Sequence, residues 1–192
     1  MNSRVRTIRT AFLLGLLALL TAWPGAAQAQ QRPRDPAKYR AWLENQVRHE
    51  LVTLPYYSLF DNLEYRVEGD KVTLLGQVVR PSTKSDAEAR VKKIEGVTSV
   101  DNQIEVLPAS PMDDHIRFRE YRAIYSSGFL SHYALAPVPP VHIIVNEGHV
   151  TLEGVVATEA EKNAANIAAN GVPGVFSVTN HLRVEKESPK KK

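Results

Sequence analysis

Two stretches of the chain decide its fold: GDKVTLLGQV at residues 69–78 and EGHVTLEGVV at residues 147–156. A shift of 78 positions places one on the other. In both, a glycine-containing turn is followed by apolar residues at every second position, the period of a β-strand with one buried face. The same local design is therefore used twice.

The shift of 78 positions also matches residues outside these stretches, without a gap, over about 40 residues. Identical pairs include Val67 with Val145, Ala87 with Ala165, Gly96 with Gly174, Val100 with Val178, Asn102 with Asn180 and Val106 with Val184. Chance does not sustain such a register. We therefore expect two domains of one fold, at residues 36–108 and 111–186, joined by a short linker at residues 109–111.

Within each unit the spacing of the apolar residues changes along the chain between that of a helix and that of a strand. The order of these changes predicts a helix, two strands, a second helix and a last strand (α-β-β-α-β). Apolar residues four apart indicate the helices, and alternating residues indicate the strands. The expected fold class is α+β, with two helices on one face of each three-stranded sheet. The predicted core positions of the helices are Leu43, Val47, Leu51, Ala87, Val91 and Ile94 in the first unit and Tyr121, Tyr125, Phe129, Ala165, Ala169 and Val172 in the second.

Two local details of the second unit can be predicted. Thr158 and Glu161 have the spacing of a capping box at the start of a helix. Pairing Val145 with Val150 in the hairpin would place His142 near Glu153. Much of the uncovered sheet faces is polar, through Thr73, Gln77, Thr151 and Glu153. Apolar spots that could receive the other domain remain at Leu75, Val79 and Val155.

Residues 1–29 have the order of a secretory signal peptide. Three arginines precede an apolar run at residues 11–20, and small residues end at Ala29, after which we expect cleavage. The run is shorter than the roughly 20 residues of a membrane span, although an uncleaved anchor is the alternative. With no cysteine there is no lipidation site. These features predict export of the chain from the cytoplasm.

The charge of the processed chain argues against nucleic acid as the partner. Cleavage removes three of the 24 basic residues and none of the 21 acidic ones, which leaves 21 of each. A general nucleic-acid binder would keep an excess of positive charge. The short arm at residues 30–35 and the tail at residues 187–192 are basic, and the usual role of such a tail is to keep the chain end solvated.

No motif of catalysis or of cofactor binding is present. The chain lacks a Gly-x-Ser-x-Gly elbow, a phosphate-binding glycine loop and a His-Glu-x-x-His helix. Its six histidines are scattered, and His142 and His149 of the predicted hairpin would not converge on one ion. We therefore expect no enzyme activity, no metal site, no cofactor and no small-molecule substrate.

Two pairs of repeated residues need an explanation. Gly76 and Gly154 lie inside strands, where glycine costs about 0.5–1 kcal/mol relative to alanine. A bulge or the close approach of another element is the structural reading, and backbone contact with a ligand is the functional one. Asn102 and Asn180 share the parity of buried residues, so a hydrogen-bonded bulge or turn is expected there.

The most unusual segment, residues 115–133, interleaves arginines with aromatic residues. This composition suits an anionic lipid surface, where rings settle at the level of the headgroups. Tyr121, Tyr125 and Phe129 fall on core positions of the first unit, so their burial is the alternative. The exposed candidates for lipid binding are then Arg117, Phe118, Arg119 and Arg122.

The repeated pattern Gly-x-Val-x-Leu-x-Gly-x-Val, followed by a helix with alanines and by Gly-Val-x-x-Val-x-Asn-x-Leu-x-Val, resembles the BON domain of bacterial envelope proteins. The second copy carries it at residues 148–156 and 174–184; the first, at residues 69–76 and 96–106, has one extra residue after the turn glycine. The resemblance implies a periplasmic or surface-associated module linked to osmotic stress, envelope integrity and phospholipid binding, without catalytic residues. In some relatives the first helix of the second domain contacts lipid.

Two functions from different classes follow as hypotheses. The first is a non-catalytic module that touches anionic phospholipid weakly and reversibly through the first helix of the second domain. The second is a soluble periplasmic factor that binds envelope proteins, in the manner of a chaperone, through the exposed sheet faces.

Overall fold

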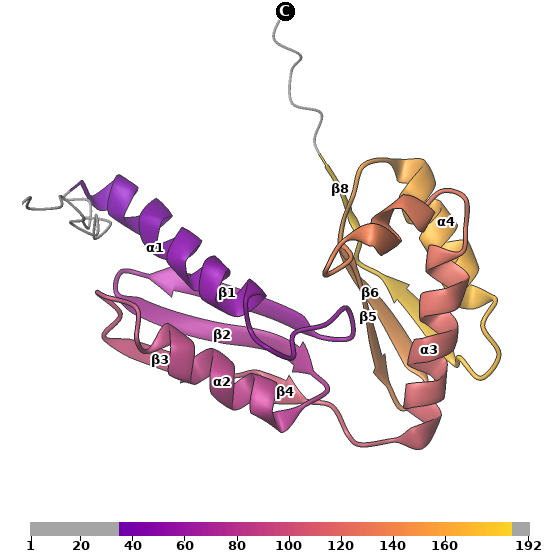
Figure 1. Cartoon of the computed structure of the whole chain (residues 1–192), viewed down its shortest axis with the longest axis horizontal. Coiled ribbons are helices and arrows are strands. Elements are labelled where there is room, and N and C mark those ends of the chain that lie inside the picture. The colour runs from indigo at the N-terminus through magenta and orange to yellow at the C-terminus, as the bar shows by residue number, and fades with distance from the viewer. Residues whose placement is uncertain (1–34, 186–192) are drawn as a thin grey trace, which may run out of the picture. The chain divides into compact units, whose positions relative to one another are not determined.

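The computed structural model describes residues 35–185. The predicted signal peptide at residues 1–29 and the predicted tail at residues 187–192 lie outside these residues. The described chain contains two α+β repeats, each a small sheet with its two long helices on one face (Figure 1). This confirms the predicted fold class.

The first repeat runs from a helix through a hairpin to a second helix and an edge strand. A proline begins each helix, and Asp35 caps the first one by accepting hydrogen bonds from the amides of Ala37 and Lys38. Its elements are α1 (Pro36–Val52), β1 (Asn62–Glu68), β2 (Lys71–Val78), α2 (Pro81–Val91), β3 (Ser99–Asn102) and β4 (Glu105–Val106).

The second repeat has the same order with one added element, a 3-10 helix after its first helix. The predicted capping box is confirmed: Thr158 accepts from the amide of Glu161, and the Glu161 carboxylate accepts from the amide of Thr158. The elements are α3 (Pro111–Tyr125), η1 (Ser131–Leu135), β5 (Val141–Asn146), β6 (His149–Val156), α4 (Glu159–Asn170), β7 (Ser177–Asn180) and β8 (Arg183–Val184).

Each sheet is built around the second strand of its hairpin. β2 pairs antiparallel with β1 and parallel with β3 and β4, and β6 pairs in the same way with β5, β7 and β8. A parallel neighbour requires a crossover, which α2 and α4 supply. The predicted register is confirmed, since Val145 lies opposite Val150 and His142 opposite Glu153.

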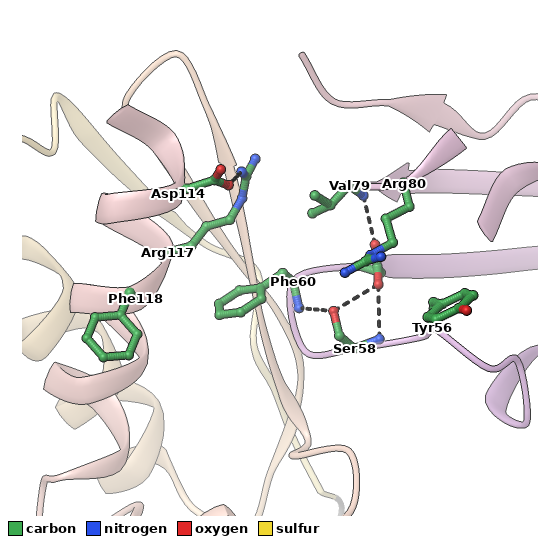
Figure 2. A pocket seen from close by; sticks show the side chains of 9 residues that line it. Tyr56, Ser58, Phe60, Val79, Arg80, Asp114, Arg117 and Phe118 are labelled. Carbon is green, nitrogen blue, oxygen red and sulfur yellow. Dashed lines mark hydrogen bonds and ion pairs between the residues drawn. The ribbon is translucent and has the colours of Figure 1, made fainter. Parts of the chain in front are cut away.

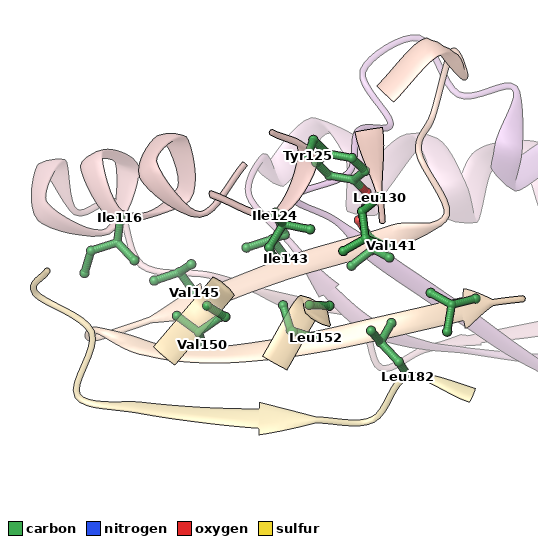
Figure 3. Packing of buried hydrophobic residues seen from close by; sticks show 13 residues of the cluster. Ile116, Ile124, Tyr125, Leu130, Val141, Ile143, Val145, Val150, Leu152 and Leu182 are labelled. Atoms are coloured by element: carbon green, nitrogen blue, oxygen red, sulfur yellow. Dashed lines mark hydrogen bonds between the residues drawn. The ribbon is translucent and has the colours of Figure 1, made fainter. Parts of the chain in front are cut away.

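Each repeat has its own hydrophobic core between its sheet and its helices. In the first, Leu43, Val47 and Leu51 of α1 are buried as predicted. In the second, Figure 3 shows the helix and strand residues that meet. They include Ile116, Ile124, Tyr125, Val141, Ile143, Val145, Val150, Leu152 and Leu182.

The prediction of which residues of α3 face the core is wrong in part. Tyr125 is buried and Tyr121 packs against the core, but Phe129 lies beyond the end of the helix and is 60% exposed. Ile116 and Ile124 fill the core positions instead. The shift of 78 positions fails here because the connection from α3 to β5, residues 126–140, is longer than its counterpart at residues 53–61.

Candidate functional site

The repeated asparagines join a broken edge strand to a helix. Asn102 is the last residue of β3, and its amide group donates to the carbonyl oxygen of Lys84 in α2 at 3.0 Å. Its carbonyl oxygen accepts from the amide of Ile104 at 3.2 Å. Asn180 makes the equivalent bonds to Lys162 at 3.1 Å and Leu182 at 3.0 Å. The predicted hydrogen-bonded turn is confirmed, so these residues are structural.

Gly76 and Gly154 lie inside strands because the backbone of the neighbouring chain segment comes too close to leave room for a side chain. Gly154 has φ +120°, and a Cβ atom there would lie 1.9 Å from the carbonyl oxygen of Pro140. At Gly76, with φ +103°, it would lie 2.1 Å from the carbonyl oxygen of Asn62. Real atoms cannot approach so closely, and φ values of this kind favour glycine. The structural reading, a close approach, is the one that the geometry supports.

The hairpin histidines are engaged separately. Nδ1 of His142 lies 2.7 Å from the carbonyl oxygen of Asp61, and burial lowers the pKa of this ring. Nδ1 of His149 lies 2.7 Å from the hydroxyl of Ser177. Within residues 35–185 no three His, Asp or Glu side chains are placed to hold a metal ion.

Arg117 was expected to be exposed, and this was wrong: it is 3% exposed. Its guanidinium donates to the carbonyl oxygen of Val145 at 2.7 Å and pairs with Asp114 at 2.6 Å. The side chain therefore fastens α3 to the end of β5. The physical reason is the helix register, because Arg117 follows Ile116 on the covered side, and a buried guanidinium needs such partners. A lipid contact is not available to it in this conformation.

The other three candidates lie on the exposed side of α3. Phe118 is 58% exposed, and the guanidinium of Arg122 stands 5.8 Å from the centre of its ring. Arg119 is exposed and donates one hydrogen bond to the carbonyl oxygen of Pro173 at 3.1 Å. A guanidinium carries five N–H groups, so both arginines can still bind an anion.

A buried acid on the opposite side of the same helix was missed by sequence reasoning. Glu120 is 0% exposed, and neither oxygen of its carboxyl group has a hydrogen-bond partner among the described residues. Burial raises its pKa to about 8, so the group is protonated at neutral pH. Its position four residues from both Ile116 and Ile124 would have revealed it, had the helix register been known.

Exposed apolar residues are concentrated in the second repeat. Of the nine large hydrophobic residues exposed in residues 35–185, only Val52 and Tyr56 belong to the first repeat. The other seven are Met112, Phe118, Phe129, Leu135, Val155, Ile167 and Phe176. Because burying such side chains is favourable, each of them is a possible point of contact with a partner. The second repeat is therefore the better candidate for an interaction.

A pocket of about 360 Å³ adjoins the first half of α3 (Figure 2). Both repeats belong to one compact unit, and both contribute to its walls. The guanidinium of Arg80 stands 5.2 Å from the centre of the Tyr56 ring. The carboxylate of Asp61 accepts from the amides of Val79 and Ser58. The other lining residues are Phe60, Asp114, Arg117 and Phe118. Sequence spacing could not predict this pocket because its walls come from distant segments.

None of the helices in residues 35–185 has the length and apolar character that crossing a membrane requires.

Comparison with known proteins matches two segments of the chain to one family model, that of the BON domain, at residues 40–108 and 129–186. The second match begins after α3. No curated protein matches the chain.

Two similar solved structures are of CdsD, a structural protein of the type III secretion system of Chlamydia trachomatis, and one of them is described as its C-terminal domain. Both are 14% identical and cover 75% of this chain. The matches extend over 98% and 92% of those chains, with TM-scores of 0.28 and 0.27.

Proposed function

We propose that this chain, which belongs to the BON domain family, binds anionic phospholipid surfaces weakly and reversibly through the exposed side of α3. The BON domain is a non-catalytic binding module, and the family is associated in general with phospholipid. The observation that carries the proposal is the group formed by Phe118, Arg119 and Arg122, in which an exposed ring lies beside two exposed cations.

The strength of such binding follows from the groups available. Each cation near an anionic membrane contributes about 1 kcal/mol, so Arg119 and Arg122 together contribute about 2 kcal/mol. Millimolar binding corresponds to about 4 kcal/mol. Insertion of apolar side chains has to supply the difference, and a buried phenylalanine contributes about 1.5–3 kcal/mol. Electrostatics alone would not hold the protein at a membrane.

The proposed setting is the bacterial periplasm, with a role in envelope integrity or in the response to osmotic stress. The support is the predicted signal peptide at residues 1–29 together with the family. Fractionation of cells that produce the tagged full-length chain tests the location. Recovery in the cytoplasm at full length would contradict it.

Vesicle flotation of residues 30–192 tests the lipid proposal. The protein should float with phosphatidylglycerol vesicles at low salt and should float less at moderate salt, because salt screens the attraction between exposed charges. It should not float with phosphatidylcholine vesicles, because they carry no net negative charge to attract the arginines. Changing both Arg119→Glu and Arg122→Glu should abolish flotation. The matched control is Arg40→Glu with Arg48→Glu, which makes the same change of charge on the exposed side of α1. Equal flotation of both double variants would contradict the proposal.

A second candidate function is protein binding through the uncovered sheet faces. Val155 points away from the covered face of its sheet and is 38% exposed, which leaves an apolar spot on an otherwise polar surface. This function predicts that the protein suppresses aggregation of an unfolded client without lipid, and that Val155→Thr weakens the effect. Absence of any suppression would remove this candidate.

A further inference from the structure

One of the most exposed rings of the second repeat is held in a fixed place. Phe176, which is 73% exposed, follows α4 and precedes β7. Its amide donates to the carbonyl oxygen of Gly148 at 2.9 Å, and its ring lies over that glycine, where a Cβ atom would be only 2.6 Å from the ring. The centre of the His149 ring lies 5.9 Å from the centre of the Phe176 ring. The absence of a side chain at Gly148 thus makes room for an exposed phenylalanine.

The first repeat shows that the fold does not need this ring. Thr98 occupies the position of Phe176, and Asp70 occupies that of Gly148. The same backbone bond forms between them, from the amide of Thr98 to the carbonyl oxygen of Asp70, also at 2.9 Å. The backbone hydrogen bond therefore forms equally well whether its residues are aspartate and threonine or glycine and phenylalanine. What differs in the second repeat is an apolar group presented to solvent.

The Phe176 loop, residues 171–176, lies beside α3 (Figure 1, where it joins α4 to β7). Pro173 accepts the hydrogen bond from Arg119, and the side chain of Ile116 lies 3.9 Å from where a Cβ atom of Gly174 would be. Gly148 in turn donates to Asp113 in the first turn of α3 at 2.9 Å. The loop is thus tied to the helix that carries the exposed arginines.

We propose that Phe176 is a second point of membrane insertion, which enters the headgroup region of an anionic bilayer beside α3. This inference rests on the proposed lipid binding by α3. Phenylalanine on the apolar part of a surface that also carries arginine is the arrangement of peripheral membrane-binding segments. The loop GVPGVF has no charged side chain of its own, so its approach to anionic headgroups meets no repulsion from within the loop.

The chemistry of the insertion point suits a lipid surface better than a soluble anion. Free phosphate or a soluble headgroup would bind to the arginines and would gain nothing from Phe176. A bilayer offers an apolar layer within reach of the ring, and burial of the ring then adds to the attraction of Arg119. A surface of two parts also resists rotation of the repeat on the membrane.

Phe176→Thr is the direct test, because it installs the residue that the first repeat carries on the same backbone bond. Partition of residues 30–192 into phosphatidylglycerol vesicles should weaken about tenfold, the effect of losing one inserted ring. Thermal unfolding should be unchanged, since the side chain is exposed. Inorganic phosphate at equal concentration should not distinguish Phe176→Thr from the parent protein.

Depth of insertion provides the second measurement. Phe176→Trp should be quenched by phosphatidylglycerol with brominated acyl chains, whereas Thr98→Trp, the matched site in the first repeat, should not. Both proteins keep Trp42, which cancels in the comparison. Equal quenching of the two sites would overturn the inference.

The outcomes separate this inference from the function on which it rests. If the parent protein binds vesicles and Phe176→Thr binds equally well, lipid binding by α3 stands and the second insertion point does not. If the parent protein does not bind vesicles at all, both proposals fail. If Phe176→Thr instead changes the mass of the protein in sedimentation equilibrium without lipid, the ring belongs to an interface between copies of the chain, and the inference is overturned.

Discussion

The guanidinium of Arg117 donates to the carbonyl oxygen of Val145 at 2.7 Å, in a site from which solvent is almost excluded. An arginine that composition alone assigns to a lipid surface is thus an internal fastener between α3 and β5. Its neighbour Arg119, two residues further along the helix, is exposed. The two arginines should therefore contribute very differently to the stability of the fold.

Arg117→Met should destabilise the protein by about 2 kcal/mol, because the carbonyl oxygen of Val145 loses a charged donor in a buried place. Arg119→Met should change stability by less than about 0.5 kcal/mol, the usual range for surface substitutions. Urea unfolding with equal slopes for both variants checks this. A larger loss for Arg119→Met than for Arg117→Met would show that the burial of the two arginines is assigned wrongly.

Glu120 should make the stability of the protein fall as pH rises. In the unfolded chain the carboxyl group has its ordinary pKa of about 4.5, and in the folded chain burial raises the pKa to about 8. Between these values the folded state holds a proton that the unfolded state has released, so unfolding becomes easier as pH increases. Below about 4.5 the contribution of this group is complete, and above about 8 the loss levels off.

Glu120→Gln removes this ionisation and keeps the size of the side chain. We expect it to be more stable than the parent at pH 9, by about 1.4 kcal/mol for each unit of the pKa difference that is realised. At pH 5 the two proteins should differ little. Glu159→Gln, an exposed position on α4, is the control and should leave the pH dependence unchanged. Parallel stability curves for Glu120→Gln and the parent protein would contradict the buried, unpaired state of the acid.

The two asparagines should differ in their contribution to stability. Asn102 donates to the carboxylate of Glu88 at 3.0 Å in addition to the carbonyl oxygen of Lys84. The bonds that the structure gives Asn180 are to backbone groups of Lys162 and Leu182. Asn102→Ala should therefore cost more than Asn180→Ala, within a range of about 1–3 kcal/mol for buried groups that lose partners. Thermal unfolding of both single variants decides the order, and a reversed order would contradict this assignment.

Gly154→Ala should disrupt the second sheet, since the added carbon would lie 1.9 Å from the carbonyl oxygen of Pro140. We expect a loss of more than about 3 kcal/mol, as for severe overpacking of a well-packed interior. Gly171→Ala is the comparison, because a carbon there would lie 3.4 Å from the nearest atom, the carbonyl oxygen of Ala168. Circular dichroism at 25 °C separates the two variants. A folded Gly154→Ala protein of parent stability would rule out the close approach.

Most of the fold follows from the sequence because two features reinforce each other. The strands and the second helix of each repeat are set by alternation and by helical spacing, and the shift of 78 positions repeats both. The hairpin register could be fixed at Val145 and Val150 because a slip of one residue would turn every buried side chain outward. Asn102 could be interpreted because it falls in the alternation of the buried residues, where a polar side chain needs hydrogen-bond partners. Gly154 could be interpreted because a strand position without a side chain indicates that another element approaches closely.

The candidate site was less predictable, since it depends on distances that the repeat does not conserve. The longer connection before β5 changes the register of α3, which buries Arg117 and exposes Phe129. Glu120 was missed because a charged residue in a helix usually faces solvent. Phe176 lies in a loop, where the alternation of apolar and polar residues does not predict which side chains are exposed. Only the packing of residues 171–176 against α3 places it.

The 78-residue repetition gives this protein an internal standard. Temperature, salt and pH act on both repeats at once, so a response confined to one repeat reports on its side chains and not on the solvent. Exchange of a residue between matched positions, such as Thr98 and Phe176, changes chemistry on a backbone bond of the same length in both repeats.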